Sequence, residues 1–587
     1  MFTKLQEIKK EYQTELDKLT KKSNTCSNIR LILFLIILII LINTKFNFQD
    51  NIALAIISGT LLVIFFIIVI YHNQICKKET KYQKYISLIK DYELRRNGEW
   101  KNKFDTGENI LTNDLAIDLD LVGKNSLFQL INISKSINSK RTLIKKLNEL
   151  KAKEKDILNN QEAIKELKLN PKFILNYLNI INDTKNIEET DYENNLKLLN
   201  EDKHVSKKEL IFGAITAAIT DIILILGILN IINIRFFFVM LILQLMISYI
   251  YLFKYNEEFE NISKCGRLFT DYNPIYPLIT NAVFKSKKLN RIKDDIKMGD
   301  LVNHKLNKIC NLDGYRYNFI TNVILNAIFS LNIVVLYKYN KLIIENKEIF
   351  ISNTKSITEL ENLISFTTIP LIKDNVTLPN ITDKTSITFK DIAHPLLNED
   401  KCITNNFQSK DDINIITGSN MSGKTSFMRT IAINLILMYN GSYVNASSFT
   451  SSINKIFTSI RVTDDIEAGI STFYGELLRI EKILTYSKKD KSPMIVFIDE
   501  IFKGTNYKDR ILGAKEIIKK LSKLDCIVLI TTHDFELCEI DNKKIYNYHF
   551  EEQYNEDKIS FDYKIKSGMC TKTNAKYLMS LIGIIDK

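Results

Sequence analysis

Proline, glycine and paired cysteines are scarce in this sequence. The 587 residues include only 7 prolines, 18 glycines and 8 cysteines. The cysteines form no CxxC pair and no cluster with histidine, which argues against a disulfide framework and against a zinc site. We therefore expect reduced thiols that face a cytosol.

Charge of one sign is in modest excess, since 80 lysines and arginines against 68 aspartates and glutamates leave a net charge of +12. A basic surface attracts nucleic acid or anionic lipid. Lysine, asparagine and isoleucine are abundant along the whole chain, which is the bias that an AT-rich genome imposes, so both explanations stay open. The length is too great for one core and predicts two to four domains.

Four long apolar stretches interrupt the polar sequence. A bilayer core about 30 Å thick requires about 20 helical residues. The last three stretches reach that length, and the first does so only with its less apolar flanks. No small-residue cleavage site follows the first stretch, which argues against a signal peptide. We predict four transmembrane helices in two hairpins, at about residues 29–46, 52–71, 211–232 and 236–253.

The basic residues predict how these helices are oriented. The first 30 residues carry seven lysines or arginines and residues 77–90 carry five, whereas the two loops inside the hairpins hold only Lys45 and Arg235. By the positive-inside rule, the basic segments lie in the cytoplasm. We therefore expect a multi-pass protein of the cell membrane, with its N-terminus, helical core and C-terminal domain on the cytoplasmic side.

The remaining sequence divides into a helical part and a mixed part. Residues 80–210 and 254–370 carry leucine and isoleucine at helical spacing and contain prolines only at 171, 274, 277 and 370. From about residue 385, short β-branched runs alternate with helical segments, which is typical of an α/β domain. No internal repeat is evident.

A phosphate-binding pattern lies near the start of the α/β part. Residues 413–437, INIITGSNMSGKTSFMRTIAINLIL, read as a strand, a glycine-bounded loop and a helix, and the loop matches GxxxxGK[ST]. Glycines let backbone N–H groups surround phosphates, the lysine reaches the β- and γ-phosphates, and the threonine hydroxyl binds Mg²⁺. The predicted nucleotide-binding residues are Gly418, Ser419, Asn420, Met421, Ser422, Gly423, Lys424, Thr425 and Ser426.

Two further apolar runs end in polar residues that complete such a site. MIVFIDE, 494–500, predicts a buried strand followed by two carboxylates. Asp499 is expected to bind Mg²⁺ together with Thr425, and Glu500 to polarise the attacking water. CIVLITTHD, 526–534, predicts another strand, after which His533 can sense the γ-phosphate. Without the two phosphate motifs that precede it, His533 would be interpreted as a solvent-exposed residue at the end of a strand.

These motifs resemble those of the MutS mismatch-repair family. TGSNMSGKTSFMRT is similar to the family's TGPNMGGKST loop, with Ser419 in place of proline and Ser422 in place of glycine. The other similar segments, spread over about residues 390–580, are AHPLL (393–397), DDIEAGISTFYGEL (464–477), DEIFKGTNYKDR (499–510), THDFEL (532–537) and YKIKSGMCTKTNAKYL (563–578). Fainter likenesses to the family's helical core occur at 118–132, 159–167 and 320–370.

The resemblance implies a composite ATPase. Segment 464–477 corresponds to the signature that completes the partner subunit's ATP site, which assigns Gly469, Ser471, Thr472 and Phe473 to the opposite site of a homodimer. Without the resemblance, Ser471 and Thr472 would read as the cap of an ordinary helix. The implied cofactors are ATP and Mg²⁺, and the expected fold class is an α-helical core plus a C-terminal α/β P-loop ATPase of the ABC type.

The expected domains leave no room for mismatch reading. They are an N-terminal basic segment with the first hairpin (1–80), a MutS-like helical core that the second hairpin interrupts (81–380), and the ATPase domain (385–587). No Phe-x-Glu wedge precedes the core, and the second hairpin occupies the place of the family's DNA clamp. Unstacking a base step requires an inserted wedge, so mismatch-specific DNA binding is not expected.

Two functions of different class remain open from the sequence. In the first, a membrane-tethered ATPase acts on DNA in repair or recombination by shape and charge. In the second, the ATPase drives a membrane or protein-assembly event without DNA. An ABC transporter is disfavoured, because four spans with short loops make a thin pathway and LSGGQ is absent between the phosphate-binding motifs.

Overall fold

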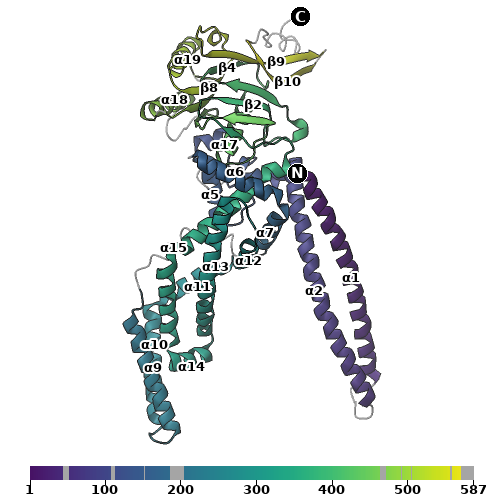
Figure 1. The fold of residues 1–587 in the computed structure, drawn as a ribbon, viewed down its shortest axis with the longest axis vertical. Helices are drawn as coiled ribbons and strands as arrows, with labels where there is room; N and C mark the ends of the chain where they lie inside the picture. The colour runs from purple at the N-terminus through teal and green to yellow at the C-terminus, as the bar shows by residue number, and fades with distance from the viewer. Residues whose placement is uncertain are drawn as a thin grey trace.

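The chain forms an elongated molecule with the α/β domain at one end, a helical core in the middle and two helical hairpins at the other end (Figure 1). The structure, a computed structural model, describes residues 1–43, 52–107, 113–150, 152–184, 204–462, 471–490, 492–503, 505–555 and 558–569. A helical N-terminal region followed by a C-terminal α/β domain is confirmed.

The first hairpin consists of α1 (Phe2–Asn43) and α2 (Ile52–Asn97). The polar halves of the two helices pack on each other and on the core, where the Tyr12 and Tyr85 rings stack with centroids 5.0 Å apart. The apolar halves are largely exposed, as at Phe66, which is 56% exposed. Helix α2 runs unbroken through residue 80, so the basic segment and the apolar segment form one continuous helix.

The second hairpin consists of α9 (Lys207–Ile228) and α10 (Arg235–Lys254). Ser206 and Glu209 form a capping box at the start of α9, which satisfies two backbone donors of its first turn. The Glu209 carboxylate also accepts a hydrogen bond from Lys254 Nζ at 2.9 Å, which joins the charged ends of the hairpin. Among the described helices, these two together with α1 and α2 are long and apolar enough to cross a membrane.

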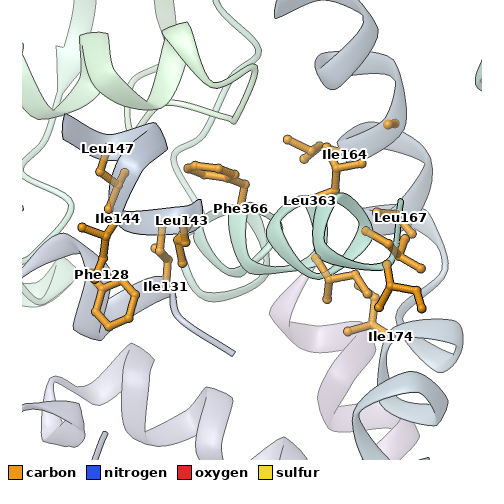
Figure 2. Packing of buried hydrophobic residues seen from close by; sticks show 14 of the residues in the cluster. Phe128, Ile131, Leu143, Ile144, Leu147, Ile164, Leu167, Ile174, Leu363 and Phe366 are labelled. Carbon is orange, nitrogen blue, oxygen red and sulfur yellow. The ribbon is translucent and has the colours of Figure 1, made fainter. Parts of the chain in front are cut away.

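The helical core packs around the C-terminal end of α15 (Leu331–Phe366). In Figure 2, Leu363 and Phe366 of α15 lie between one group of apolar residues from α4 and α5 and another from α6 and α7. Apolar residues at spacings of three and four along these helices form the buried face. The shorter core helices are α3 (Asp114–Asp118), α4 (Leu127–Ile131), α5 (Ile137–Asn148), α6 (Glu154–Leu169), α7 (Pro171–Asp183), α11 (Asn256–Thr270), α12 (Tyr276–Thr280) and α16 (Thr368–Ile372).

Two long helices connect the core to the second hairpin. Helix α13 (Lys287–Gly314) runs beside α15, and α14 (Phe319–Phe329) joins them at the end nearest α9 and α10 (Figure 1). Asn346 breaks the regular geometry of α15 with φ −128°. Both hairpins extend from the core away from the α/β domain (Figure 1).

The α/β domain contains a six-stranded sheet with the order β10-β9-β4-β8-β7-β6. All neighbours are parallel except β10 and β9. A four-stranded sheet, β1-β5-β2-β3, covers the helix that follows β4 (Figure 1). The bounds are β1 (Asn380–Ile381), β2 (Ile387–Ile392), β3 (Asn405–Ser409), β4 (Ile413–Thr417), β5 (Ser448–Ser451), β6 (Lys455–Ser459), β7 (Met494–Asp499), β8 (Cys526–Thr531), β9 (Ile545–Asn555), β10 (Lys558–Ser567), α17 (Lys424–Tyr439), α18 (Thr472–Lys489) and α19 (Tyr507–Leu521).

The register of the parallel strands brings their polar ends together. Ile416 of β4 and Asp499 of β7 both pair with Thr531 of β8. The carboxyl ends of the three strands therefore meet at one edge of the sheet. In open α/β sheets this edge is where ligands bind.

Candidate active site

The loop between β4 and α17 folds tightly because its glycines adopt left-handed backbone angles. Gly418 has φ +143° and Gly423 has φ +105°. A Cβ on Gly418 would lie 2.9 Å from the Phe550 carbonyl oxygen, and one on Gly423 would lie 3.0 Å from the Tyr563 ring. Side chains at these positions would push the loop outward. The structure places the predicted residues Ser419, Asn420, Met421 and Ser422 in this loop and Ser426 in the first turn of α17.

Lys424 closes the loop on itself. The side chain is buried, and its Nζ donates hydrogen bonds of 2.7 Å to the carbonyl oxygens of Gly418 and Ser419. Burial lowers the pKa of Lys424, while the nearby carboxylates Glu500 and Asp499 favour its charged form. The ammonium therefore lies in the loop's concavity at the N-terminus of α17, where backbone N–H groups and the helix dipole also favour an anion.

Thr425 and Asp499 are in direct contact. Thr425 Oγ1 donates a hydrogen bond of 2.8 Å to one Asp499 carboxylate oxygen, and Thr531 Oγ1 donates to the other. A carboxylate and a hydroxyl at this spacing are the hard oxygen donors that Mg²⁺ prefers, alongside phosphate oxygens. The donor set therefore fits the divalent cation that the sequence predicts here.

Glu500 is held in a strained conformation beside Asp499. It has φ +54°, which is uncommon for a residue with a side chain. Its backbone N–H donates to the Thr531 carbonyl oxygen at 3.1 Å. Its carboxylate contacts His533 Nε2 at 3.2 Å and Lys503 Nζ at 2.8 Å. The hydrogen bond from His533, assisted by Lys503, lowers the pKa of Glu500 to about 2, so the carboxylate is ionised at neutral pH.

His533 links this carboxylate to the loop. Its Nε2 atom also lies 3.0 Å from Asn420 Oδ1, so one ring nitrogen faces both the loop and Glu500. Sequence patterns predicted a role for Asn420, Glu500 and His533 but not for Lys503. Lys503 belongs to the DEIFKGTN segment. Its position three residues after Glu500 was the one feature of the sequence that could have indicated a contact with that carboxylate.

The described part of the signature segment begins at Ser471, so Gly469 lies outside the described residues. Ser471 is the N-cap of α18, and its hydroxyl accepts a hydrogen bond of 3.4 Å from the backbone N–H of Tyr474. Thr472 begins the helix. The Phe473 ring meets the Phe502 ring edge-on with centroids 5.7 Å apart, two residues beyond Glu500. The capping role is therefore present in the folded chain.

A cavity of about 250 Å³ adjoins the loop, and sequence reasoning missed it. Its lining includes Ile403, Gly423, Ser426 and Tyr563. His394, from the AHPLL segment, also faces it, and burial lowers the pKa of His394 to about 3, so its ring is neutral. The cavity joins residues from β10, from the loop before β3 and from α17, which are distant in sequence.

Acidic residues at the start of the core bind arginines of the α/β domain. Asp118 is fully buried and accepts a hydrogen bond of 2.6 Å from Arg479 of α18. Its two carboxylate oxygens also accept from the backbone N–H groups of Ile460 and Arg461. Nearby, Asp120 pairs with Arg429 of α17 at 2.8 Å. The helix after the loop and the helix after the signature segment are thus joined to one core segment.

Comparisons with known proteins identify the C-terminal part. Residues 414–585 match the family model described as MutS domain V. An alignment of 264 positions, which covers 43% of the chain, is 33% identical to the human protein named "MutS protein homolog 4" and, equally, to its mouse counterpart. The alignments cover 28% of the human protein and 27% of the mouse protein, so the chain spans under a third of these relatives. Residues 414–585 of the chain therefore form a MutS domain V.

Proposed function

We propose that this protein is a membrane-anchored, Mg²⁺-dependent ATPase with a P-loop, ABC-type nucleotide domain. The observation that carries the proposal is the contact between Thr425, at the N-terminus of α17, and Asp499, beside the ionised Glu500. One edge of the sheet therefore brings together the backbone N–H donors of the loop, a buried lysine, hard oxygen ligands and a carboxylate base. This is the set of groups that phosphoryl transfer to water requires.

Each residue has a distinct role in the proposed reaction. Lys424 exchanges its loop carbonyl partners for the β- and γ-phosphate oxygens of ATP. Thr425 and Asp499 would hold Mg²⁺, which supplies charge neutralisation at the phosphates when it is bound. Glu500 orients the attacking water and accepts its proton. His533, between Asn420 and Glu500, detects whether the γ-phosphate is present.

The cavity beside the loop is proposed to hold the adenine base. It adjoins Gly423 and Ser426, so a nucleotide whose phosphates lie in the loop can reach it with its base. Tyr563 offers an aromatic face, and Ile403 offers an apolar one. Base stacking on an aromatic side chain is worth about 1–3 kcal/mol.

The proposed domain arrangement is that of the sequence analysis, with hairpins at residues 1–80 and 211–253 anchoring a core (81–380) and an ATPase domain (385–587) in the cytoplasm of a cell-membrane protein. The extension of both hairpins to the same side, away from the α/β domain, supports this topology (Figure 1). Their exposed apolar surfaces support it as well, because lipid is the solvent in which such surfaces are stable.

A change in the bound nucleotide can be transmitted to the hairpins through three contacts between the α/β domain and the helical core. Asp118 and Asp120 join the core to α18 and α17. At the other end of α17, Ser442 Oγ donates a hydrogen bond of 3.0 Å to the carbonyl oxygen of Phe366, the last residue of α15. Helix α15 leads from there to the second hairpin, so movements of α17 are transmitted along it.

We expect Lys424→Ala to remove Mg²⁺-dependent ATP hydrolysis by the full-length protein in detergent or lipid. The loss of a charged hydrogen-bond partner costs about 1.5–3 kcal/mol, which is roughly a 10–150-fold loss of ATP affinity. Affinity is measured with a fluorescent ATP analogue, and hydrolysis by phosphate release with and without EDTA. Lys515→Ala, at an exposed position of α19, is the matched control. Unchanged hydrolysis in Lys424→Ala would reject the proposed function.

The site is proposed to be completed by Ser471, Thr472, Phe473 and Gly469 of a second copy. Ser471→Arg is then expected to damage the site of the opposite subunit. Each parent homodimer has two damaged sites, whereas a mixed dimer with Lys424→Ala keeps one intact site, so hydrolysis by the mixture is expected to rise above the average of the two parents. Thr485→Arg, at an exposed position of the same helix, is the control. Hydrolysis per molecule that does not vary with protein concentration would contradict the composite site.

DNA, bound by charge and shape, is the proposed partner of this ATPase, and the net charge of +12 is compatible with it. We expect duplex affinity to fall steeply between low and physiological salt, because phosphate contacts release counterions. A single-mismatch duplex is expected to bind no better than a matched one. Competition binding at fixed salt, with and without ATP, measures both. A mismatch preference beyond about tenfold, or about 1.4 kcal/mol, would reveal a reading element. Absence of any duplex binding would favour the membrane or protein-assembly function.

A further inference from the structure

Helix α14 (Phe319–Phe329) has its polarity reversed relative to a water-soluble helix. Its buried residues are Asn322, Asn326 and Ala327. Its large apolar residues face outward, with exposed fractions of 74% at Phe319 and 50% at Ile324. A helix in water buries its apolar stripe and exposes its polar one. The reversed arrangement is stable in hydrocarbon, where apolar side chains face lipid and polar ones pair inside the protein.

The buried asparagines of α14 take part in a polar network with the second hairpin. Ser248 Oγ of α10 donates a hydrogen bond of 2.6 Å to Asn326 Oδ1. Gln244, one turn earlier on α10, donates to Ser330 at the corner between α14 and α15. Ser330 Oγ donates at 2.7 Å to the carbonyl oxygen of Gly213 in α9. Helix α14 is therefore fastened to both helices of the hairpin.

The network lies inside the apolar part of the hairpin. The charged ends of α9 and α10 are marked by the Glu209–Lys254 ion pair. Ser248 and Gln244 precede Lys254 by six and ten residues, so they lie about 9 and 15 Å along the helix from it at 1.5 Å per residue. Half of a bilayer's hydrocarbon core is about 15 Å thick. A membrane that holds α9 and α10 therefore also surrounds α14.

Aromatic residues and a cavity surround the corner. Tyr315 and Tyr317 precede α14 and are 51% and 70% exposed, which is typical of the interface between headgroups and acyl chains. A cavity of about 640 Å³ opens between α13, α14 and α15, with Leu325, Phe329 and Val334 among its mainly apolar lining. Lys338 is also part of the lining and can meet a lipid phosphate.

We propose that α14 is inserted into the cytoplasmic leaflet as a re-entrant element and that the cavity at its corner takes an acyl chain of a phospholipid. The chain turns by 79° between α14 and the following helical segment. It returns along α15 beside α13, so it enters and leaves on the core's side (Figure 1). The number of full spans stays even, and the ATPase domain stays on the side of the N-terminus. This inference rests on the proposed membrane anchoring.

The test uses tryptophan fluorescence in liposomes made with lipids brominated along their acyl chains. The sequence has one tryptophan, Trp100, which is buried in the core and gives the background emission. Phe319→Trp and Ile324→Trp each add a reporter to α14. Ile222→Trp adds one to the exposed face of α9, and Val283→Trp adds one to the exposed surface of the core. Iodide, which stays in the aqueous phase, quenches the tryptophans that are exposed to water.

Both α14 reporters are expected to lose as large a fraction of their added emission to brominated lipid as Ile222→Trp does, and to resist iodide, while Val283→Trp behaves in the opposite way. Quenching of the α14 reporters by iodide would show that α14 faces water. Quenching by neither agent would show that protein, such as a second copy, covers it. If brominated lipid quenches Ile222→Trp, either of these results overturns the insertion of α14 and leaves the proposed membrane anchoring of the hairpins intact. If brominated lipid does not quench Ile222→Trp, both the insertion of α14 and the proposed membrane anchoring are overturned.

Discussion

Replacing Glu500 with glutamine is expected to leave ATP binding intact and to slow hydrolysis by roughly 10²–10⁴-fold, the range that a positioned general base contributes. The wild-type carboxylate is ionised, because the hydrogen bond from His533 and the contact with Lys503 lower its pKa to about 2. An amide has the same shape but accepts no proton from the attacking water. Affinity depends mainly on Lys424 and the loop, which the substitution does not touch.

The sign of this pKa shift also predicts how hydrolysis responds to acid. A carboxylate whose folded pKa is depressed loses its charge only as the pH falls through that low value, here about 2. Loss of activity between pH 7 and pH 5 would therefore have to come from other groups. Single-turnover hydrolysis of pre-bound ATP separates chemistry from binding, and Glu481→Gln, at an exposed position of α18, is the control. Comparable turnover in Glu500→Gln and wild type would remove Glu500 from the proposed role.

Replacing Asp118 with alanine is expected to destabilise the junction between the core and the α/β domain by about 3–5 kcal/mol, the cost of breaking a buried ion pair on one side. Asp118 is fully buried, and its loss leaves the Arg479 guanidinium without its 2.6 Å carboxylate partner. The backbone N–H groups of Ile460 and Arg461 lose their acceptor as well.

The measurement is thermal unfolding of the full-length protein in detergent, together with hydrogen exchange in α18. Asp114→Ala is the matched control. That side chain is half exposed, pairs with Lys482 at 3.0 Å and lies only 3.8 Å from the same Arg479, so its loss should cost no more than about 1 kcal/mol. In the double variant Asp118→Ala with Arg479→Met, the destabilisation should be smaller than the sum of the single effects. Equal unfolding of Asp118→Ala and Asp114→Ala would show that the buried pair does not hold the junction.

The local elements of the α/β domain follow from patterns that short segments carry. A β-branched run, a glycine-bounded loop and an amphipathic helix predicted β4, the loop and α17 in order. The apolar runs ending in Asp499 and His533 predicted β7 and β8 in the same way. Parallel strands place their ends at one edge, so Thr425 and Asp499 could be expected to meet before any coordinates were known. The domain limits at 80 and 385 stay predictions, and α2 passes residue 80 without a break.

The long apolar helices were also predictable, because a helix of about 20 apolar residues is recognised by length and composition alone. The role of α14 was not. Its sequence, FITNVILNAIF, is equally compatible with a core helix and with a membrane helix. Only its packing, with asparagines inward and phenylalanine and isoleucine outward, distinguishes the two, and that packing depends on α10 and on the corner at Ser330.

By itself, the sequence determined which segments form strands, helices and apolar stretches, because these depend on neighbours within a few turns, and it predicted which residues carry phosphate chemistry. Only the tertiary structure decided that Asp118 would meet Arg479, 361 residues away, and that Tyr563 would lie against Gly423. Such contacts depend on how separate segments pack, and one chain's pattern does not encode their distances. The strand ends that form the site follow from local rules, and the contacts between the site and the helical core follow from packing.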